Sequence, residues 1–377
     1  MVLRWIPLAL AAVCMSSIGL LASDVPLQKL PDWAMGPFIR PTAENPVIKP
    51  DPNSLFDCPM RGHPIQWEAK QVFNPAAVVH DGKICVLYRA EDDTGENKIG
   101  GHTSRIGLAE SEDGLHFTRM SNPVFYPDND AQKHEEWTGG CEDPRVIATA
   151  DGAYVLTYTQ WNKTLTHLAV ATSRDLLHWE KHGPAFARAS DGKYKDMGCK
   201  SGAIVGELRG GNLVAARING KYWMYWGDGP VHLATSSNLI DWEPLETAGG
   251  KLFVALDRRD GHFDSAIAEA GPPAVLTDRG ILLFYNGENA AVHGDPRLSA
   301  DEYSAGQALF DARDPTKLVA RTDQPFFQPT MSFEKTGQYV AGTTFIEGLV
   351  PFNGKWFLYY GCADSFVGVA IFDGEIR

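Results

Sequence analysis

Polar residues able to transfer protons or bind hydroxyl groups head five similar segments of this 377-residue chain. Each segment opens with polar residues and a Gly or Pro, and then becomes apolar. The segments cover 73–78, 142–146, 200–205, 269–275 and 346–350, and their polar heads are Asn74, Asp143, Ser201, Glu269 and Glu347. Carboxylates gathered in one pocket repel one another, which separates their pKa values and prepares them for acid and base catalysis.

Further charged and aromatic residues cluster near these heads in the sequence. They are Arg89, Glu91, Arg105, Glu142, Arg145, Lys200, Asp228, Asp264, Tyr360 and Asp364. Carboxylates bind sugar hydroxyls and aromatic rings stack on sugar faces, so this set suits a carbohydrate site. A structural interpretation competes with it, because an Asp-Pro pair such as Asp143-Pro144 often begins a turn and Arg145 is a suitable ion-pair partner.

A second recurring phrase indicates the elements that must position these residues. It consists of a glycine, alternating apolar residues, and a Tyr or Trp with a polar residue just behind it. The phrase covers 82–91, 152–161, 220–228, 280–288 and 354–364, and its aromatic residues lie 70, 68, 59 and 75 residues apart. Such a recurrence indicates a repeat architecture.

Turns of the Ser-x-Asp type at 111–117, 173–179 and 236–242 complete the repeating unit. Short apolar runs between Gly, Pro, Asn and Asp clusters are typical of all-β proteins. We therefore predict an all-β fold, a five-bladed β-propeller with a central funnel-shaped active site, over residues 71–377. We expect residues 24–70 to wrap the outside or complete the last blade. A β-sandwich, the competing architecture, does not explain five equal units with polar heads.

Charge and motif content exclude several classes of function. The net charge of −13 argues against a nucleic-acid partner, which requires a basic surface. The sequence has no HExxH, paired CxxC, P-loop or Gly-x-Ser-x-Gly motif. We therefore expect neither a metal nor a cofactor.

The first residues are typical of a secretory signal. Arg4 precedes the uncharged stretch 5–22, which ends in small residues, so we expect residues 1–23 to be a signal peptide. The protein would then be periplasmic or secreted, with no membrane span in the mature chain. A membrane anchor, or a lipid anchor at Cys14, is the alternative. The sequence does not determine the oligomeric state.

Six strings in this chain carry a resemblance to a known family. They are Phe-Asn-Pro at 73–75, Leu-Tyr-Arg-Ala at 87–90, Gly-Cys-Glu-Asp-Pro-Arg at 140–145, Lys-Ser-Gly-Ala at 200–203, Gly-Pro-Pro at 271–273 and Tyr-Gly-Cys-Ala-Asp-Ser at 360–365. In order and type they resemble the motifs of glycoside hydrolase family 130 over roughly residues 71–377. That family comprises β-mannoside phosphorylases and β-1,2-mannosidases built on five-bladed propellers.

The resemblance implies roles for individual residues. Asp143 matches the general acid of the family, and Asn74, Arg89 and Asp364 match residues that hold the terminal mannose. In the hydrolase branch acidic residues activate water, and their positions fall on Asp228 and Glu269. Asp228 is shorter than the Glu expected there, which leaves Glu269 as the favoured base.

Two features of the resemblance separate hydrolysis from phosphorolysis. The phosphorylases carry an Arg before the second Ser-Asp turn, where this chain reads Leu-Thr-His-Leu at 165–168. That departure favours hydrolysis. Arg145 and Lys200, however, remain available to an anion such as phosphate.

We predict an inverting, exo-acting glycosidase that releases mannose from β-1,2-linked mannosides, with a β-mannoside oligosaccharide or glycan as its partner. Inversion requires an acid and a base about 6.5–9.5 Å apart on opposite faces of the sugar. One alternative is a β-mannoside phosphorylase that produces α-mannose 1-phosphate. The alternative of another class is a non-catalytic glycan-binding propeller.

Overall fold

The computed structural model describes residues 29–374, and nearly all of its regular structure is β. Its helical elements are the short helix α1 (Lys133–Glu136) and the 3-10 turns η1 (Ala189–Gly192) and η2 (Ser332–Glu334). The all-β prediction is therefore confirmed. The predicted signal peptide, residues 1–23, lies outside the described residues. None of the described helices has the length and apolar character needed to cross a membrane.

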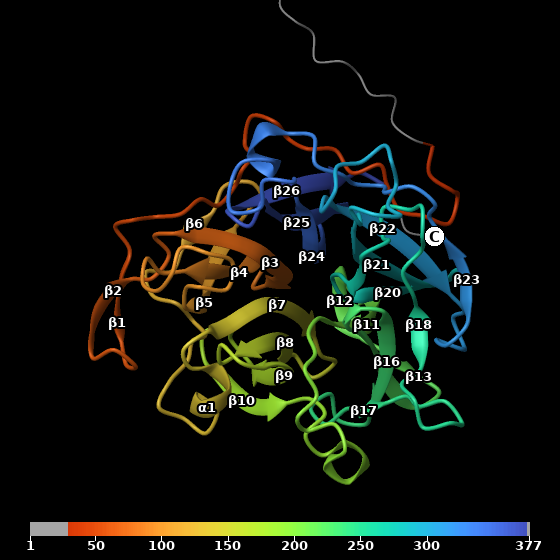
Figure 1. Ribbon diagram of the computed structural model, residues 1–377, viewed down its shortest axis with the longest axis horizontal. Coiled ribbons are helices and arrows are strands. Elements are labelled where there is room, and N and C mark those ends of the chain that lie inside the picture. The colour runs from red at the N-terminus through yellow and green to blue at the C-terminus, as the bar shows by residue number, and fades with distance from the viewer. Residues whose placement is uncertain (1–28, 375–377) are drawn as a thin grey trace, which may run out of the picture.

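The strands form five antiparallel units around a common centre, and a short separate hairpin, β1 (Leu55–Cys58) and β2 (His63–Gln66), precedes them (Figure 1). The first unit contains β3 (Gln71–His80), β4 (Lys83–Glu91), β5 (Ser104–Ser111) and β6 (Thr118–Arg119). The second contains β7 (Gly140–Ala148), β8 (Tyr154–Trp161), β9 (Thr166–Ser173) and β10 (Trp179–Pro184).

The third unit is the most divided of the five. It contains β11 (Gly202–Arg209), β12 (Asn212–Ala215), β13 (Arg217–Ile218), β14 (Lys221–Trp226), β15 (Asp228–Gly229), β16 (Val231–Ser236), β17 (Glu243–Pro244) and β18 (Val254–Leu256). The fourth contains β19 (Ile267–Ala270), β20 (Ala274–Thr277), β21 (Gly280–Glu288), β22 (Tyr303–Phe310) and β23 (Leu318–Arg321). The fifth contains β24 (Thr344–Phe352), β25 (Lys355–Cys362) and β26 (Phe366–Phe372).

Short pairings join neighbouring units. Parallel pairings join β5 to β7, β7 to β12 and β11 to β20, and an antiparallel pairing joins β15 to β19. Strands β3 to β23 thereby form one closed network, and β24, β25 and β26 form a separate three-stranded sheet. The first strands of several units, β3, β7, β11 and β24, contact one another, so they surround the centre.

The glycine of the recurring phrase makes the turn that reverses the chain. Its φ is positive in all five copies, Gly82, Gly152, Gly220, Gly280 and Gly354. In three copies the residue before it, an Asp or an Asn, also has positive φ, which is the requirement of a tight hairpin turn. The phrase therefore places a hairpin between the first and second long strands of a unit.

The recurring tyrosines make a repeated buried contact with a carboxylate. The hydroxyls of Tyr88, Tyr158, Tyr285 and Tyr360 donate to Glu68, Glu136, Asp264 and Glu334, at 2.7, 2.8, 2.8 and 2.7 Å. In the same order, each carboxylate also pairs with a cation, namely Arg119, Lys181, Arg321 and Arg40. A buried charge is costly unless it is paired and hydrogen-bonded, so each cluster supports its own unit.

Two predicted substrate ligands belong to these clusters. Tyr360 and Asp264 are both fully buried, with side chains committed to the contacts just described. The third unit has Trp226 in place of the tyrosine, and its Nε1 has no hydrogen-bond partner among residues 29–374. The recurring aromatic is therefore a packing residue in these units, and the structure does not bring Tyr360 or Asp264 to the polar heads.

Residues ahead of the first unit close the fifth one. Ile39 and Ile48 form bridges with Ile371 and Val367 of β26. Arg40 donates to the carbonyl of Gln328 as well as to Glu334. In three other units the corresponding cation lies on the outermost strand: Arg119 on β6, Lys181 on β10 and Arg321 on β23. Arg40 is the equivalent cation of the fifth unit, so residues 39–48 take the place of its outermost strand.

Replacing Arg40 with Leu is expected to lower the free energy of unfolding by about 3 kcal/mol, because Glu334 would stay buried without its cation. The Glu334 side chain is 0% exposed and that of Arg40 is 14% exposed. Urea denaturation at equilibrium measures the loss. The control is Arg174→Leu, whose partner Asp151 is solvent-exposed, and no measurable loss is expected there. Equal losses in the two variants would contradict the prediction.

Candidate active site

The polar heads are turned out of their strands by irregularities in the backbone. Asn74, Asp143 and Ser201 have φ values of 46°, 48° and 57°, in the left-handed region. The strand register shifts around Asn74, Asp143 and Glu347. A bulge of this kind redirects a side chain, and strained backbone of this kind clusters at functional sites. Local sequence explains part of it, because Asn and Asp tolerate this conformation better than most residues.

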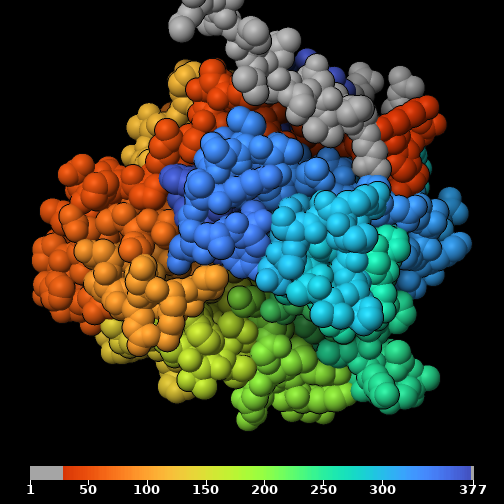
Figure 2. Space-filling view, turned by 45° about the horizontal axis from the view of Figure 1, so that its top comes forward, coloured from red at the N-terminus to blue at the C-terminus, as the bar shows by residue number. Residues whose placement is uncertain are grey.

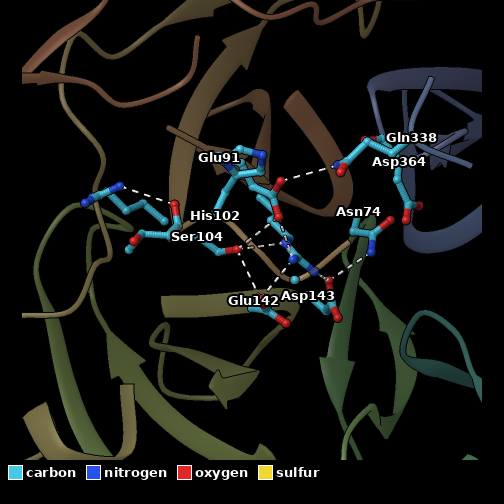
Figure 3. A network of polar contacts seen from close by, with 12 residues as sticks. Asn74, Glu91, His102, Ser104, Glu142, Asp143, Gln338 and Asp364 are labelled. Carbon is cyan, nitrogen blue, oxygen red and sulfur yellow. Dashed lines mark hydrogen bonds and ion pairs between the residues drawn. The ribbon is translucent and has the colours of Figure 1, made fainter. Parts of the chain in front are cut away.

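Arg89 on β4 connects the first two units through four side chains, Glu91, Ser104, Glu142 and Asp143, which Figure 3 labels. Its guanidinium donates to Asp143 Oδ1 at 3.0 Å, to Glu91 Oε1 and Glu142 Oε1 at 2.8 Å each, and to Ser104 Oγ at 3.0 Å. Burial opposes the charge of Arg89, but these carboxylates outweigh burial and raise the pKa of Arg89. Glu91 and Glu142, both predicted to bind substrate, therefore hold Arg89 in place.

Asp143 on β7 is held from one side only. Asn74 Nδ2 donates to its Oδ1 at 2.8 Å, and Arg89 uses the same oxygen. Its Oδ2 makes no hydrogen bond to any other residue within 29–374, which leaves that oxygen for a ligand. Burial would raise the pKa of Asp143, but Arg89 and Lys200 outweigh burial and lower it to about 2.

Glu269 on β19 has the opposite electrostatic environment. Ser201 Oγ donates to Glu269 Oε1. Burial, and next the nearby Asp228, raise the pKa of Glu269 to about 7, against the effect of Arg145. Asp228 lies directly opposite Glu269 in the pairing of β15 with β19, and it is exposed. Two carboxylates of the site thus have pKa values moved in opposite directions.

Lys200 and Asp364 complete the polar surroundings. Burial lowers the pKa of Lys200, but Asp143, Glu142 and Glu269 outweigh burial, so the pKa is raised. These carboxylates thus stabilise the charged form of Lys200, which directly precedes Ser201, the residue that donates to Glu269. Burial raises the pKa of Asp364 to about 7, although Arg89 opposes the rise.

Gln338 is a site residue that the sequence analysis missed. It lies between β23 and β24, and its Nε2 donates to Glu91 Oε2 at 3.3 Å and to the carbonyl of Asp364 at 3.2 Å (Figure 3). Figure 2 shows this blue segment and the cyan segment near residue 295 beside a hollow in the surface. No sequence motif marks Gln338, since its position depends on a loop that crosses to the first unit. Ser104 is a second site residue that the sequence analysis does not predict. Its position at the start of β5 is the signal that could have indicated it.

Three other predicted ligands lie away from the open side of the site. Arg105 is fully buried and pairs with Asp92 at 2.7 Å. Arg145 and Glu347 are also buried, and they pair with each other at 3.0 Å. The structure therefore brings together Asn74, Arg89, Glu91, Glu142, Asp143, Lys200, Ser201, Asp228, Glu269 and Asp364, with Arg145 and Glu347 beneath them.

The site offers groups for proton transfer and hydroxyl binding. Within residues 29–374 no group of three or more His, Cys, Asp or Glu side chains has an arrangement that could hold a metal ion. An ionised Asp143, a Glu269 near half protonation at neutral pH and several hydrogen-bonding side chains form one cluster. Paired carboxyls with separated pKa values are the pattern of acid and base catalysis.

Comparison with protein families gives one match over most of the chain. A family model described as β-1,4-mannooligosaccharide phosphorylase, of glycoside hydrolase family 130, matches residues 40–376. A 1,2-β-oligomannan phosphorylase of Thermoanaerobacter sp. strain X514 is 30% identical over 315 residues, which is 82% of this chain and 92% of that protein.

Solved structures of greater sequence identity share the fold. One is 58% identical with a TM-score of 0.90, over 91% of this chain and 95% of that one. Its description states that the family of mannoside phosphorylases contains glycoside hydrolases that target β-1,2 mannosidic linkages in Candida mannan. A glycosyl hydrolase from Bacteroides ovatus is 57% identical with a TM-score of 0.90, over 92% of this chain and 96% of that one.

Proposed function

Because the chain belongs to glycoside hydrolase family 130, an enzyme family that acts on mannosides, we propose that it releases terminal mannose from β-1,2-linked mannosides by hydrolysis with inversion. The observation that carries this proposal is the pair Asp143 and Glu269, whose pKa values are moved in opposite directions within one cluster. The β-1,2 linkage is supported by the names of a phosphorylase relative and of the 58% identical structure.

In the proposed reaction water attacks the anomeric carbon from the face opposite the leaving oxygen. Glu269 takes a proton from the water, and Asp143 supplies a proton to the leaving oxygen, directly or through a substrate hydroxyl. A β-mannoside then gives α-mannose. Asn74, Arg89 and Asp364 bind the hydroxyls of the terminal sugar.

The protonation state of the free site adds a requirement. With a pKa of about 2, Asp143 is ionised at neutral pH, while Glu269, with a pKa of about 7, is close to half protonated. In the reactive complex Glu269 must be ionised, and the proton that it carries in the free site must be on Asp143 or on the substrate hydroxyl that relays it. Substrate supplies a reason for the change, because it displaces water from Asp143 Oδ2 and disfavours the charged carboxylate there.

Phosphorolysis is the second candidate, and the names of the curated relatives support it. Lys200 is the cation that favours it, since both carboxyls stabilise its charged form. Against it stand Asp228 and Glu269, which would repel a phosphate. His167, near the position where the phosphorylases carry an Arg, binds Glu135 at 3.1 Å.

The experiment that separates the two reactions follows β-1,2-mannobiose by NMR with and without phosphate. Hydrolysis predicts free α-mannose as the first product in phosphate-free buffer, with no change in rate when phosphate is added. Release of α-mannose 1-phosphate only when phosphate is present would overturn hydrolysis and establish the second candidate.

The pH dependence of kcat/KM tests the role of Glu269. The reactive complex needs one proton on the pair of carboxyls, so kcat/KM is expected to be level below the pKa near 7 and to fall about tenfold per unit above it, where that proton is lost. The residual activity of Glu269→Gln should show no change of slope near pH 7. Asp364→Asn is the matched control, because Asp364 also has a pKa of about 7 and its loss should leave the fall in place. Activity that rises as pH rises through 7 would contradict this assignment, because it would mean that the reaction does not need the proton that the pair loses there.

We also propose that the five units are the blades of a five-bladed β-propeller. Support comes from the five successive antiparallel units, their arrangement around one centre in Figure 1, and the contacts among their first strands. A crystal structure tests this: a single continuous barrel wall without separate blades would contradict it.

We propose further that the protein is exported. The support is the signal-like pattern of residues 1–23. To test this, the chain is expressed in a bacterium with its own residues 1–23. The cells are then fractionated, and the N-terminus of the protein is sequenced. A protein retained in the cytoplasm with an intact N-terminus would overturn the proposal.

A further inference from the structure

Arg145 is buried beneath the site and directs its guanidinium at main-chain carbonyls. Its Nε donates to the carbonyl of Gly271 at 2.9 Å, and Nη2 donates to the carbonyl of Ala270 at 2.8 Å. Its Nη1 donates to the carbonyl of Asp143 at 3.2 Å. The side chain is 1% exposed, so these contacts are shielded from water.

The carbonyls that Arg145 contacts are next to the two reacting carboxyls. One belongs to Asp143 itself, on β7, and another belongs to Ala270, the residue that follows Glu269 on β19. Strands β7 and β19 start the second and fourth units, which are not consecutive along the chain. Arg145 therefore connects the backbone at Asp143 to the backbone at Glu269.

This geometry leaves Arg145 little capacity to bind an anion. A guanidinium has five N–H donors. Three are used by the carbonyls, and Nη2 also pairs with Glu347 Oε1 at 3.0 Å. The prediction that Arg145 binds substrate, or is available to phosphate, is therefore not supported by its contacts.

Gly271 makes the contact with Arg145 possible. A Cβ at this position would lie 2.8 Å from the carbonyl oxygen of Phe284 and 3.2 Å from that of Ile346. These are backbone atoms of neighbouring strands, so any larger residue would push the 270–271 segment away. The glycine thus lets two successive carbonyls approach one guanidinium.

We propose that Arg145 is a positioning residue that sets the separation between the carboxyls of Asp143 and Glu269. The inference rests on the proposed function, because it assigns those two groups as acid and base. Catalysis is sensitive to such placement, and a displacement of about 1 Å can cost about 100-fold in rate. Substrate contacts through Asn74 and Arg89 do not involve Arg145, so binding should change little.

The test compares Arg145→Lys and Arg145→Ala with the wild-type protein on β-1,2-mannobiose. A fall in kcat of about 100-fold, with KM within about threefold, is expected for both. Guanidinium ions added to Arg145→Ala should restore part of kcat, because they can occupy the vacated space. In Arg145→Ala the fall of kcat/KM near pH 7 should also move to higher pH, since Arg145 lowers the pKa of Glu269. Arg174→Ala, which changes an exposed arginine, is the control expected to behave as wild type.

Two results would overturn the inference. One is wild-type kcat in Arg145→Lys, and the other is an unchanged kcat with a raised KM for mannobiose or phosphate, which would make Arg145 a ligand. Gly271→Ala is the independent variant if Arg145→Ala does not fold, and a fall in kcat at unchanged KM is expected there too.

Crystal structures can test the positioning role of Arg145 even if the proposed function is wrong. If the wild-type protein cleaves no mannoside, the proposed function fails. The separation between the two carboxyls can still be compared in wild type and Arg145→Lys. A changed separation supports the positioning role, and an unchanged one overturns it.

Discussion

The Asp143→Asn protein is expected to release mannose about 1,000-fold more slowly than the wild type while remaining folded. Asparagine has the same shape and can still accept the hydrogen bonds from Asn74 and Arg89 at Oδ1. It cannot carry the proton that the leaving oxygen requires. Initial rates on β-1,2-mannobiose, together with a thermal unfolding curve, measure the two parts of this expectation.

The matched control is Asp81→Asn. Asp81 has the same φ of 48° as Asp143, so the two substitutions make the same demand on the backbone, but its side chain is 89% exposed. Its activity should equal that of the wild type. Full activity in Asp143→Asn would refute the acid role. Unchanged glycan binding in both the wild type and the variant, with no sugar release by either, would support the non-catalytic binding protein.

The Arg89→Met protein is expected to lose about 4 kcal/mol of unfolding free energy at pH 7, together with its activity. Arg89 is the shared partner of Glu91, Glu142 and Asp143, whose side chains are 1%, 5% and 6% exposed. Without the guanidinium these three carboxylates would remain buried next to one another. Urea denaturation at several pH values measures the loss.

The pH dependence gives this prediction a second readout. Unpaired buried carboxylates have raised pKa values in the folded variant, and protonation relieves their repulsion. The loss of stability should therefore be smaller at pH 5 than at pH 8. Arg188→Met is the control, since Arg188 and its partner Asp241 are 77% and 43% exposed, and its expected loss is below about 0.5 kcal/mol. A near-wild-type stability for Arg89→Met would show that the cluster tolerates the loss of its central cation.

The recurring phrase shows how far local sequence could predict this fold. Its Asp-Gly and Asn-Gly pairs predict hairpins because few residues accept positive φ, and the structure has those turns at Gly82, Gly220 and Gly354. Alternating apolar residues predict strands for an equally local reason. For Tyr360, the tyrosine of the last copy, the pattern predicts a sugar-stacking ring. Whether such a ring faces a ligand or a buried carboxylate depends on segments far away in sequence, such as the one that carries Glu334.

In the candidate site, too, local sequence predicts some residues and not others. Polar heads followed by proline predict Asn74 and Asp143 as site residues, and their backbones are strained as such functional positions often are. Arg145 stands in the same motif as Asp143, yet its contacts are with Ala270 and Gly271, more than a hundred residues later. Gln338 carries no motif and reaches Glu91 only through a loop.

By itself the sequence determined the family and the all-β class, and the family resemblance supplied the acid and base candidates, because strand alternation, turn residues and short motifs are local. The tertiary structure alone decided which charged residues meet. It placed Asp264 and Tyr360 in buried support clusters and Arg145 between two backbones. It also separated the pKa values of Asp143 and Glu269. Burial and charge pairing depend on distances between units, and no local pattern encodes those distances.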